Sequence, residues 1–398
     1  MSIDFDFKFP KFNSGASSGR HYNNSFIVYG PDTHQQVHNF VPKGRFTVIL
    51  NDSKVDLSDV NLGIIGDVAI AVTSEPDVSR VQEIIKLLPD TPCNVIAIGG
   101  GATMDLAKGI VCARHYPNDL RVGYGESGDL TSRIETPYDF LALLPTTVGS
   151  GSEASRYFVL FQEKRKKASR SWQALPRVVV VDPNLISYLT PEIAKIQLFD
   201  CWSHLTEVSL CNLEYSPFAM HAVEAAKLSL MDFVKSEGQV NTVQSRLGLQ
   251  VLSYIGGSAI SNTRTGALHT VGEALASQIS MPHVWSLYFS ALNYENLLGG
   301  EYRSTQISIG GSNVERAKSA LGDLAFWIPY LKQIVGKHLQ LDLKEIEAFD
   351  FEEFENVVLG DKVLWNKEHP VNLKEIDVTR YLRRTIAEVK SFGQTWDN

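Results

Sequence analysis

The sequence predicts a two-part fold: an α/β N-terminal domain with a doubly wound parallel sheet, followed by an all-α C-terminal domain. In the first half of the chain, short β-branched runs alternate with helical patterns, which is the order of a parallel sheet covered by helices. After Asp182-Pro183 these runs stop and long stretches of helical spacing follow. We therefore expect one domain over residues 1–186 and a second over residues 187–398.

Each element follows from its local pattern. Six apolar, β-branched runs are expected to form strands, at 25–30, 46–50, 67–72, 94–98, 140–144 and 178–181. Helical spacing between them predicts helices at 79–88 and 104–114. In the second half the same spacing predicts helices at 194–213, 219–235, 243–261, 270–279, 287–298, 316–335 and 378–391. Residues 1–22 are polar and aromatic, and we expect them to wrap a surface or an oligomer partner.

The composition of the 398-residue chain excludes several classes of protein. Hydrophobic residues make up 44%, and the net charge of −8 argues against nucleic acid or an anionic membrane as the main partner. The four cysteines are scattered without a CxxC pair, which is typical of reduced thiols in the cytoplasm. The N-terminus lacks an apolar secretion signal, and no apolar run is long enough to span a bilayer. We expect a cytoplasmic protein that acts on a small molecule.

A candidate metal site begins with Asp200 and His204, which share one face of the helix expected at 194–213. A carboxylate beside an imidazole is half of a divalent-metal site, although such a pair alone is more often a contact on a helix flank. His269 and His283, in later helical segments, add two imidazoles. One Asp and three His suit Fe(II), Zn(II), Co(II) or Ni(II), and ligand type does not choose among them.

Two glycine-rich turns, each following an expected strand, are candidates for phosphate binding. Gly99-Gly100-Gly101 leads into a helix, so phosphate oxygens could approach its backbone and the helix N-terminus. Gly100 could also require a dihedral that other residues cannot adopt. The second turn, Pro145–Glu153, offers hydroxyl groups for a diphosphate or ribose. A simple tight turn and an internally hydrogen-bonded loop are the respective alternatives.

The basic run Glu163–Lys167 has two interpretations. It is either a solvated hairpin face or the source of a lysine, Lys167, that reaches a cofactor phosphate.

Taken in order, these motifs resemble the iron-containing (group III) alcohol dehydrogenases, in the superfamily that also holds dehydroquinate synthase and glycerol dehydrogenase. Gly99–Lys108 is similar to the family's GGGSxxDxAK, and Pro145–Glu153 to its PTTxGTGSE. Pro176–Pro183 and Asp200–Glu207 are similar to its P-x-x-x-x-x-DP strand and DAxxHxxE helix. His269 and His283 stand fourteen residues apart, as the family's later metal histidines do. The resemblance runs from about residue 29 to residue 386.

The resemblance implies a dehydroquinate synthase-like fold, in which a Rossmann-like domain binds NAD(P) and a helical domain binds one divalent metal, Fe²⁺ or Zn²⁺. It also implies a homodimer or larger oligomer. Carried over by position, the catalytic metal ligands are Asp200, His204, His269 and His283. The candidate cofactor residues are Asp52, Gly99, Gly100, Gly101, Asp105, Thr146, Thr147, Ser150 and Lys167. A carboxylate at Asp52 would favour NAD over NADP, because it repels a 2′-phosphate.

The chain departs from the family pattern at three places near the expected substrate. Glu273 stands where many members have a second histidine, and Val284 replaces the glycine of the usual PHG. Arg156 and Tyr157 replace small polar residues after the GSE. The Glu153–Arg156 segment looks most like the branch containing 3-deoxy-octulosonate 8-oxidases, which act on a sugar acid. We therefore assign Arg156, Tyr157 and Glu273 to a substrate site for an anionic molecule. The alternative for Arg156 is an ion pair within the protein, for example with Glu153 or Glu273.

The sequence thus predicts a metal-dependent alcohol dehydrogenase that transfers hydride between NAD(P) and a small, anionic alcohol, aldehyde or sugar acid. The alternative within the superfamily is a dehydroquinate-synthase-like cyclase or lyase that uses NAD transiently. A metal-free binding protein on the same fold is a third hypothesis.

Overall fold

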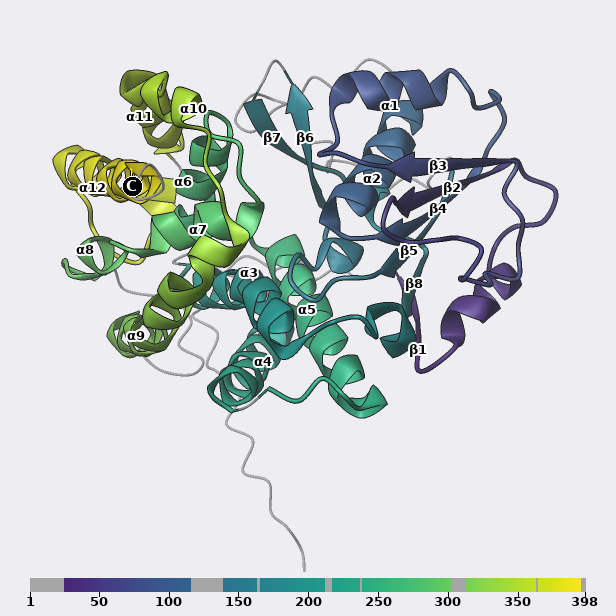
Figure 1. The fold of residues 1–398 in the computed structure, drawn as a ribbon, viewed down its shortest axis with the longest axis horizontal. Coiled ribbons are helices and arrows are strands. Elements are labelled where there is room, and N and C mark those ends of the chain that lie inside the picture. The colour runs from purple at the N-terminus through teal and green to yellow at the C-terminus, as the bar shows by residue number, and fades with distance from the viewer. Residues whose placement is uncertain are drawn as a thin grey trace, which may run out of the picture.

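The computed structural model describes residues 25–115, 139–162, 165–211, 217–236, 238–302, 313–362 and 364–394. The wrapping role expected of residues 1–22 lies outside these ranges. Figure 1 shows a twisted sheet with helices α1 and α2 beside it, next to a body built from helices. This arrangement confirms the predicted α/β domain followed by an all-α domain.

The sheet is parallel throughout and has the order β1-β8-β5-β4-β2-β3. Its strands are β1 (Phe26–Tyr29), β2 (Thr47–Asp52), β3 (Val68–Val72), β4 (Asn94–Gly99), β5 (Phe140–Pro145) and β8 (Val178–Val181). All six predicted strands are therefore present. The chain passes from β2 outward to β3 and then returns to β4 on the other side of β2, so the strand order reverses between β2 and β4.

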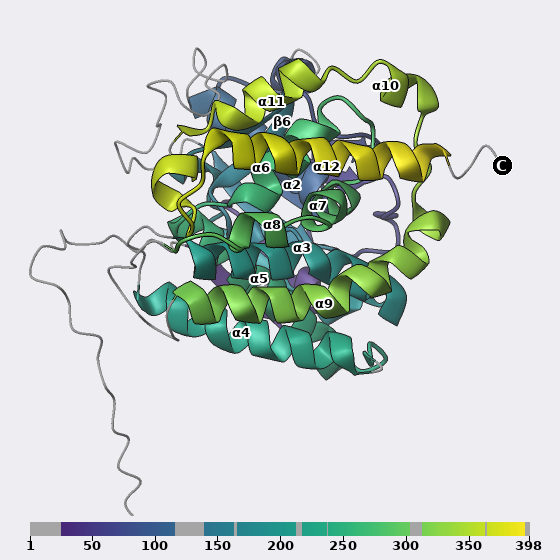
Figure 2. The ribbon, with the colours of Figure 1, turned by 90° about the vertical axis from the view of Figure 1, so that its left-hand side faces the viewer.

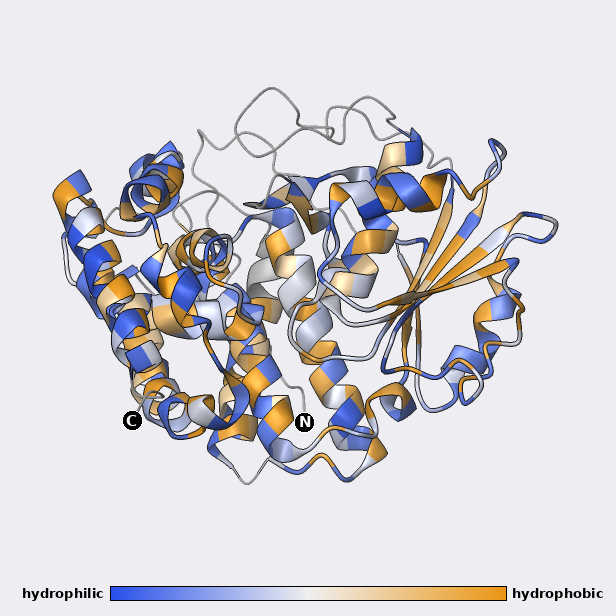
Figure 3. Ribbon diagram, turned by 45° about the horizontal axis from the view of Figure 1, so that its top comes forward, coloured by the Kyte–Doolittle hydropathy of each residue, from blue (hydrophilic) through white to orange (hydrophobic). Residues whose placement is uncertain are grey.

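The central strands are apolar along their whole length because both faces of the sheet are covered. Every residue of β4 and of β5 is buried. On one face, Leu50, Val95 and Leu143 pack with α1 (Val78–Ile85) and α2 (Gly101–His115). On the other face, residues of the same strands pack with η1 (Thr33–Asn39) and the loop after β2. Figure 3 shows the strands as a band of mainly hydrophobic colour.

A separate antiparallel hairpin consists of β6 (Tyr157–Gln162) and β7 (Arg165–Arg170). Its strand β7 holds Arg165, Lys166 and Lys167 of the basic run, but Lys166 is not solvated: only 5% of its side chain is exposed. Its ammonium lies 3.5 Å from Glu75, and its N–H donates to Ser277 of the helical body. The hairpin therefore connects the sheet side of the molecule with the helical side.

The helical body contains ten α-helices among the described residues, together with the π-helix η6 (Leu364–Glu368). The α-helices are α3 (Pro191–Leu210), α4 (Pro217–Lys235), α5 (Val243–Asn262), α6 (Ala267–Ala276), α7 (His283–Ala291), α8 (Glu295–Leu298), α9 (Asn313–His338), α10 (Leu343–Glu347), α11 (Phe351–Leu359) and α12 (Glu375–Gln394). The helix predicted at 287–298 is wrong in one respect, since a turn at 292–294 divides it into α7 and α8. The short α10 and α11 were not predicted, because five and nine residues carry little periodicity.

Helix α3 is the centre of this body. Every residue from Leu198 to Leu210 is buried, and a helix buried on all sides is surrounded by other elements. Helices α4, α5, α6, α7 and α9 contact it. In Figure 2, α12 forms an outer layer, where it contacts α7 and α8. Polar groups on α3 are therefore placed deep in the molecule.

We propose that the two domains divide near residues 186–187. The two cores that contain the sheet take their residues from Val28 to Leu185. The large core of the helical body begins at Ile186, apart from Val148.

Among the described residues, no helix is long and apolar enough to cross a membrane.

Candidate metal and cofactor site

Helix α3 supplies the first half of the candidate metal site. It begins at Pro191 behind Thr190, whose side chain accepts the N–H of Ile193 and caps the helix. Asp200 and His204 follow one turn apart, with Asp200 Oδ1 3.5 Å from His204 Nε2. Burial lowers the pKa of His204 to about 4, so its imidazole is neutral and has a lone pair to offer.

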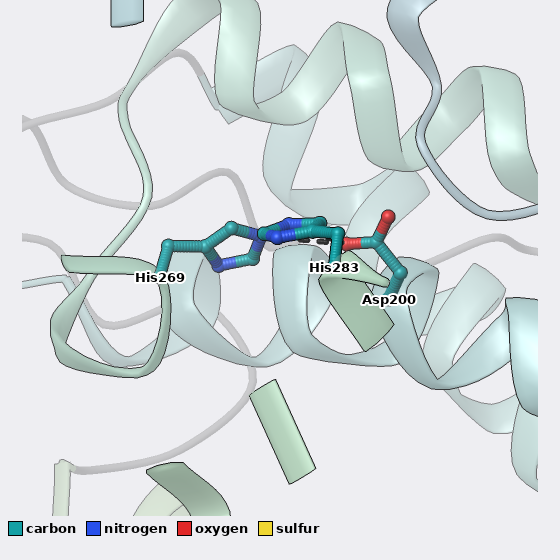
Figure 4. Close-up of side chains that lie close together, drawn as sticks. All are labelled: Asp200, His269 and His283. Carbon is teal, nitrogen blue, oxygen red and sulfur yellow. Dashed lines mark hydrogen bonds and ion pairs between the residues drawn. The ribbon is translucent and has the colours of Figure 1, made fainter. Parts of the chain in front are cut away.

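The other two histidines reach the same carboxylate from different helices. His269 is the third residue of α6 and His283 the first residue of α7. Their Nε2 atoms lie 3.4 Å and 3.7 Å from Asp200 Oδ1, and Figure 4 shows both rings directed at this oxygen. The structure therefore brings the four predicted ligands together, although residues 200 and 283 are far apart in the chain.

The donor set fits a divalent ion. Two nitrogen or oxygen ligands at about 2.0–2.1 Å from a tetrahedral ion lie about 3.4 Å apart, close to the separations found here. Ligand atoms of Asp200, His269 and His283 all lie within 4.8 Å of one another. His204 joins them through Asp200 and stacks on His269 with ring centroids 4.6 Å apart. Burial alone would raise the pKa of Asp200, but His204 and His283 hold it well below its usual range.

Glu207 is a functional candidate that sequence reasoning missed. It follows His204 by one turn, and its Oε2 lies 2.6 Å from Nδ1 of His269. Burial would raise the pKa of Glu207, but His269 and backbone N–H donors hold it below its usual range. Burial opposes charge on His269 as well, yet Glu207 and Asp200 raise its pKa to about 10. The glutamate that ends the DAxxHxxE motif was the signal available in the sequence. Its partner, His269, lies 62 residues further along the chain.

The candidate cofactor residues gather where the carboxyl ends of three strands meet. Asp52 ends β2, Gly99 ends β4, and Thr146 follows β5 and donates its N–H to Gly99. The reversal of strand order falls between β2 and β4. In open α/β sheets, ligands bind in the crevice at such a switch point.

The glycine turn is required for space rather than for an unusual dihedral. None of Gly99, Gly100 and Gly101 is among the positive-φ residues, so the expected dihedral constraint on Gly100 is wrong. A Cβ at Gly100 would instead lie 3.1 Å from Cγ2 of Thr147, and one at Gly101 would lie 3.3 Å from Ser150. The two glycine-rich turns therefore pack against each other at the N-terminus of α2, where N–H groups lack helical partners.

The turn after β5 also contacts the metal helix. The N–H of Val148 donates to Gln197 on α3 at 3.0 Å. A Cβ at Gly149 would lie 2.4 Å from the carbonyl oxygen of Gln197 and 3.5 Å from Cβ of Asp200. One turn thus touches the candidate phosphate-binding glycines on one side and the candidate metal ligand Asp200 on the other.

Asp105 and Lys167 make contacts within the protein. The two carboxylate oxygens of Asp105 accept from Ser152 Oγ at 2.6 Å and from the N–H of Val159 at 2.9 Å. Lys167 lies on β7 with its ammonium 3.4 Å from Gln162 Oε1. Asp105 therefore joins α2 to the turn after β5 and to the hairpin.

The three candidate substrate residues lie where the hairpin meets α5 and α6. The Arg156 guanidinium lies 4.4 Å above the Trp172 ring, and within the described chain it forms no ion pair with the expected partners Glu153 or Glu273. The Tyr157 hydroxyl donates to the carbonyl of Thr263 at 3.0 Å. Glu273 is one turn after His269 on α6; burial raises its pKa, and His269 and Lys166 oppose the rise.

In this protein, glycine-rich turns at the end of a parallel sheet lie against a helical body that carries an Asp/His cluster. These two features together define its class. A sequence model described as iron-containing alcohol dehydrogenase matches residues 24–183. Over these residues the chain is similar to the iron-containing alcohol dehydrogenase family.

Individual relatives are distant. The 1,3-propanediol dehydrogenase of Citrobacter freundii is 25% identical over 240 residues, which are 59% of this chain and 61% of that protein. The iron-containing alcohol dehydrogenase of Thermotoga maritima has a TM-score of 0.72 at 17% identity, covering 93% of this chain and all of that one. A sulfoacetaldehyde reductase from Bifidobacterium kashiwanohense, in complex with NAD⁺, has a TM-score of 0.70 at 18% identity and covers 94% and 100%. The structural similarities establish the fold.

Proposed function

We propose that this protein is a metal-dependent alcohol dehydrogenase that transfers hydride between NAD(P) and a small, anionic alcohol, aldehyde or sugar acid. The observation that carries the proposal is the turn after β5, which touches both the glycine turn at Gly100 and the metal helix at Asp200. A dinucleotide on the first and a substrate oxygen beside the second would be adjacent. The match of residues 24–183 to the iron-containing alcohol dehydrogenase model and the NAD⁺ in the structure of the sulfoacetaldehyde reductase support the same proposal.

The residues that would hold the metal are Asp200, His204, His269 and His283. A divalent ion there, Fe²⁺ or Zn²⁺, would act as a Lewis acid on the substrate oxygen. The protein excludes water from three of the four ligands, since Asp200, His204 and His269 are each at most 8% exposed. His283 is more accessible, with 31% of its side chain exposed, which leaves a side of the cluster open to a substrate.

Residues at the carboxyl ends of β2, β4 and β5 would hold the cofactor, which would supply the hydride chemistry. Gly99, Gly100, Gly101, Thr146, Thr147 and Ser150 would surround the diphosphate and ribose, and Lys167 could extend this set. Asp52 stands at the end of β2, next to Gly99, and would accept a hydrogen bond from the adenosine ribose.

Following the absorbance of reduced nicotinamide over many turnovers tests the reaction class. A dehydrogenase converts one NAD per substrate, so the absorbance of reduced nicotinamide changes in proportion to product. A cyclase or lyase regenerates its NAD in each cycle, so product would accumulate without net reduction. Metal analysis of the same preparation decides against the metal-free binding protein, which would hold no divalent ion.

Asp52→Ala should raise the ratio of kcat/KM for NADP to that for NAD by about 10-fold, equivalent to about 1.4 kcal/mol. The reason is that the change removes a negative charge from the position proposed for the 2′-phosphate. Steady-state kinetics with both cofactors measures the ratio.

Asp56→Ala is the matched control for this prediction. Asp56 accepts the N–H of Ser58 as Asp52 accepts that of Lys54, but it lies further along the loop. Asp56→Ala should leave the ratio of kcat/KM for NADP to that for NAD unchanged. A wild-type protein that already prefers NADP would contradict the placement of Asp52 at the ribose.

Arg156→Lys should raise KM for an acidic substrate by about 10-fold and leave KM for uncharged alcohols unchanged. Lysine keeps the charge but loses the planar fork that binds a carboxylate bidentately and stacks on Trp172. The uncharged alcohols serve as the internal control. A lower melting temperature with unchanged KM for every substrate would assign Arg156 a purely structural role.

We further propose that the protein is a cytoplasmic homodimer or larger oligomer. Strand β1 is an edge of the sheet, and its Phe26 and Tyr29 side chains are 58% and 69% exposed. An exposed apolar edge strand is suited to cover by a second copy. A monomeric mass by light scattering would contradict this assignment.

A further inference from the structure

Glu207 connects the two helices that carry most of the candidate metal ligands. It lies on α3, three residues after His204, and is 3% exposed. Its two oxygens face the beginning of α6: Oε1 lies 2.6 Å from the N–H of Leu268, and Oε2 lies 2.6 Å from Nδ1 of His269. A single buried carboxylate thus binds both the backbone and the imidazole of the segment that presents His269.

The N-terminus of α6 depends on this carboxylate. Its N-cap residue is Gly266, which has no side chain to bind the first N–H groups. Glu207 supplies the acceptor from another helix, at the positive end of the α6 dipole. Gly266 is also required for space, since a Cβ there would lie 2.9 Å from Oε1 of Glu207.

The same carboxylate determines which nitrogen of His269 can bind a metal. An ionised carboxylate only accepts hydrogen bonds, so Nδ1 of His269 must carry the hydrogen. Nε2 is then the nitrogen that can release its hydrogen and bind a metal, and it is Nε2 that faces Asp200 at 3.4 Å. His204 lacks such support, because its Nδ1 has no hydrogen-bond partner among the described residues.

We propose that Glu207 is a positioning residue for the metal centre: it holds His269 in the tautomer that binds metal through Nε2 and fixes α6 against α3. This inference rests on the proposed metal site, but it assigns to Glu207 a role separable from ligation. Outer partners of histidine ligands commonly have this effect, and their loss costs about 10–100-fold in metal affinity. A residue that only capped α6 would affect stability and leave metal affinity unchanged.

Glu207→Gln tests the role without changing the size of the side chain. If the amide NH₂ faces Nδ1, that nitrogen must accept, and the imidazole hydrogen moves to Nε2, where it blocks the metal. If the amide is turned round, its NH₂ opposes the N–H of Leu268 and two buried donors face each other. Either orientation removes one function that the carboxylate performs.

The measurement is the affinity of the metal-free protein for Zn²⁺ and for Co²⁺, by competition with a chromophoric chelator. We expect the dissociation constants of Glu207→Gln to rise about 10–100-fold and its visible Co²⁺ spectrum to change. Thr190→Ala is the matched control, because Thr190 caps α3 without contacting a ligand. This control should lower the melting temperature of the metal-free protein and keep wild-type metal affinity.

Gly266→Ala keeps the inference testable if Glu207→Gln does not fold. It leaves the carboxylate chemically intact but places a methyl group where Oε1 now lies, so metal affinity should fall in the same direction. Wild-type affinity in a folded Glu207→Gln or Gly266→Ala protein, with only a lower melting temperature, would overturn the positioning role. A wild-type protein that binds neither metal would instead overturn the proposed metal site.

Discussion

His204→Ala should purify without its metal and lose more than about 100-fold of its activity while remaining folded. Loss of an outer partner of a ligand already costs about 10–100-fold, so loss of a direct ligand should cost more. The fold should survive because Trp202, Leu205 and Val208, which surround His204 on α3, are fully buried apolar contacts. Removing a buried side chain costs about 2–5 kcal/mol, against a total stability of about 5–15 kcal/mol. Metal content, circular dichroism and turnover measure the three effects.

His38→Ala is the control for this prediction. His38 is exposed, its ring is hydrogen-bonded to the nearby carbonyl of Gln35 and it is not one of the candidate ligands, so its loss should change neither metal content nor turnover. A His204→Ala protein that is fully active and retains its metal would remove the basis for the four-ligand assignment.

Local spacing was sufficient to predict the parts of the site that lie within one element. Asp200 and His204 are one helical turn apart, and the sequence alone puts them on one face. Spacing could not show that α6 and α7 bring His269 and His283 to the same oxygen, and here the family resemblance supplied the expectation. Glu207 was missed for the same reason, since its contacts with residues 266–269 exist only after α3 and α6 have packed together.

Packing between elements also explains residues that local helix propensity disfavours. Two glycines inside α5, Gly256 and Gly257, disfavour a helix by propensity, yet α5 continues through them. The reason is a close approach: a Cβ at Gly257 would lie 1.8 Å from the carbonyl oxygen of Gly151 in the turn after β5. Gly151 itself has φ of 58°, which favours glycine. The contact between the sheet and the helical body thus depends on residues that appear unfavourable within their own elements.

The burial of Lys166 shows a different limit of sequence reasoning. A run of four basic residues is usually solvated, and alternation along a strand does not reveal which of them meets another part of the molecule. In the structure Lys166 lies between Glu75 and the side of α6, because the hairpin docks there through Ser277. Only the arrangement of the two domains distinguishes Lys166 from Lys167.

Gly100→Val should fold, keep its metal and lose at least about 10-fold in affinity for NAD. No dihedral strain is expected, since Gly100 does not have a positive φ. The obstacle is space: the Cβ would lie 3.1 Å from Thr147, and the two methyl groups of valine extend further toward the position proposed for the diphosphate. Gly100→Ala, which adds the Cβ alone, should show a smaller loss. Calorimetric titration with NAD gives the affinities, and metal analysis shows whether the second site is intact.

The control for Gly100→Val is Gly322→Val on α9, where an added Cβ has nothing within 4 Å. Gly322→Val also introduces a β-branched residue in or beside a helix, with the same cost in helix propensity. Because residue 322 lies outside the candidate site, NAD affinity should stay at the wild-type value. The graded series of glycine, alanine and valine at residue 100 separates two causes. A loss that grows with side-chain size while metal content stays constant indicates direct obstruction of the cofactor. Undiminished binding of NAD by folded Gly100→Val would instead limit the glycine turn to packing against Thr147, and the cofactor would have to approach the sheet elsewhere.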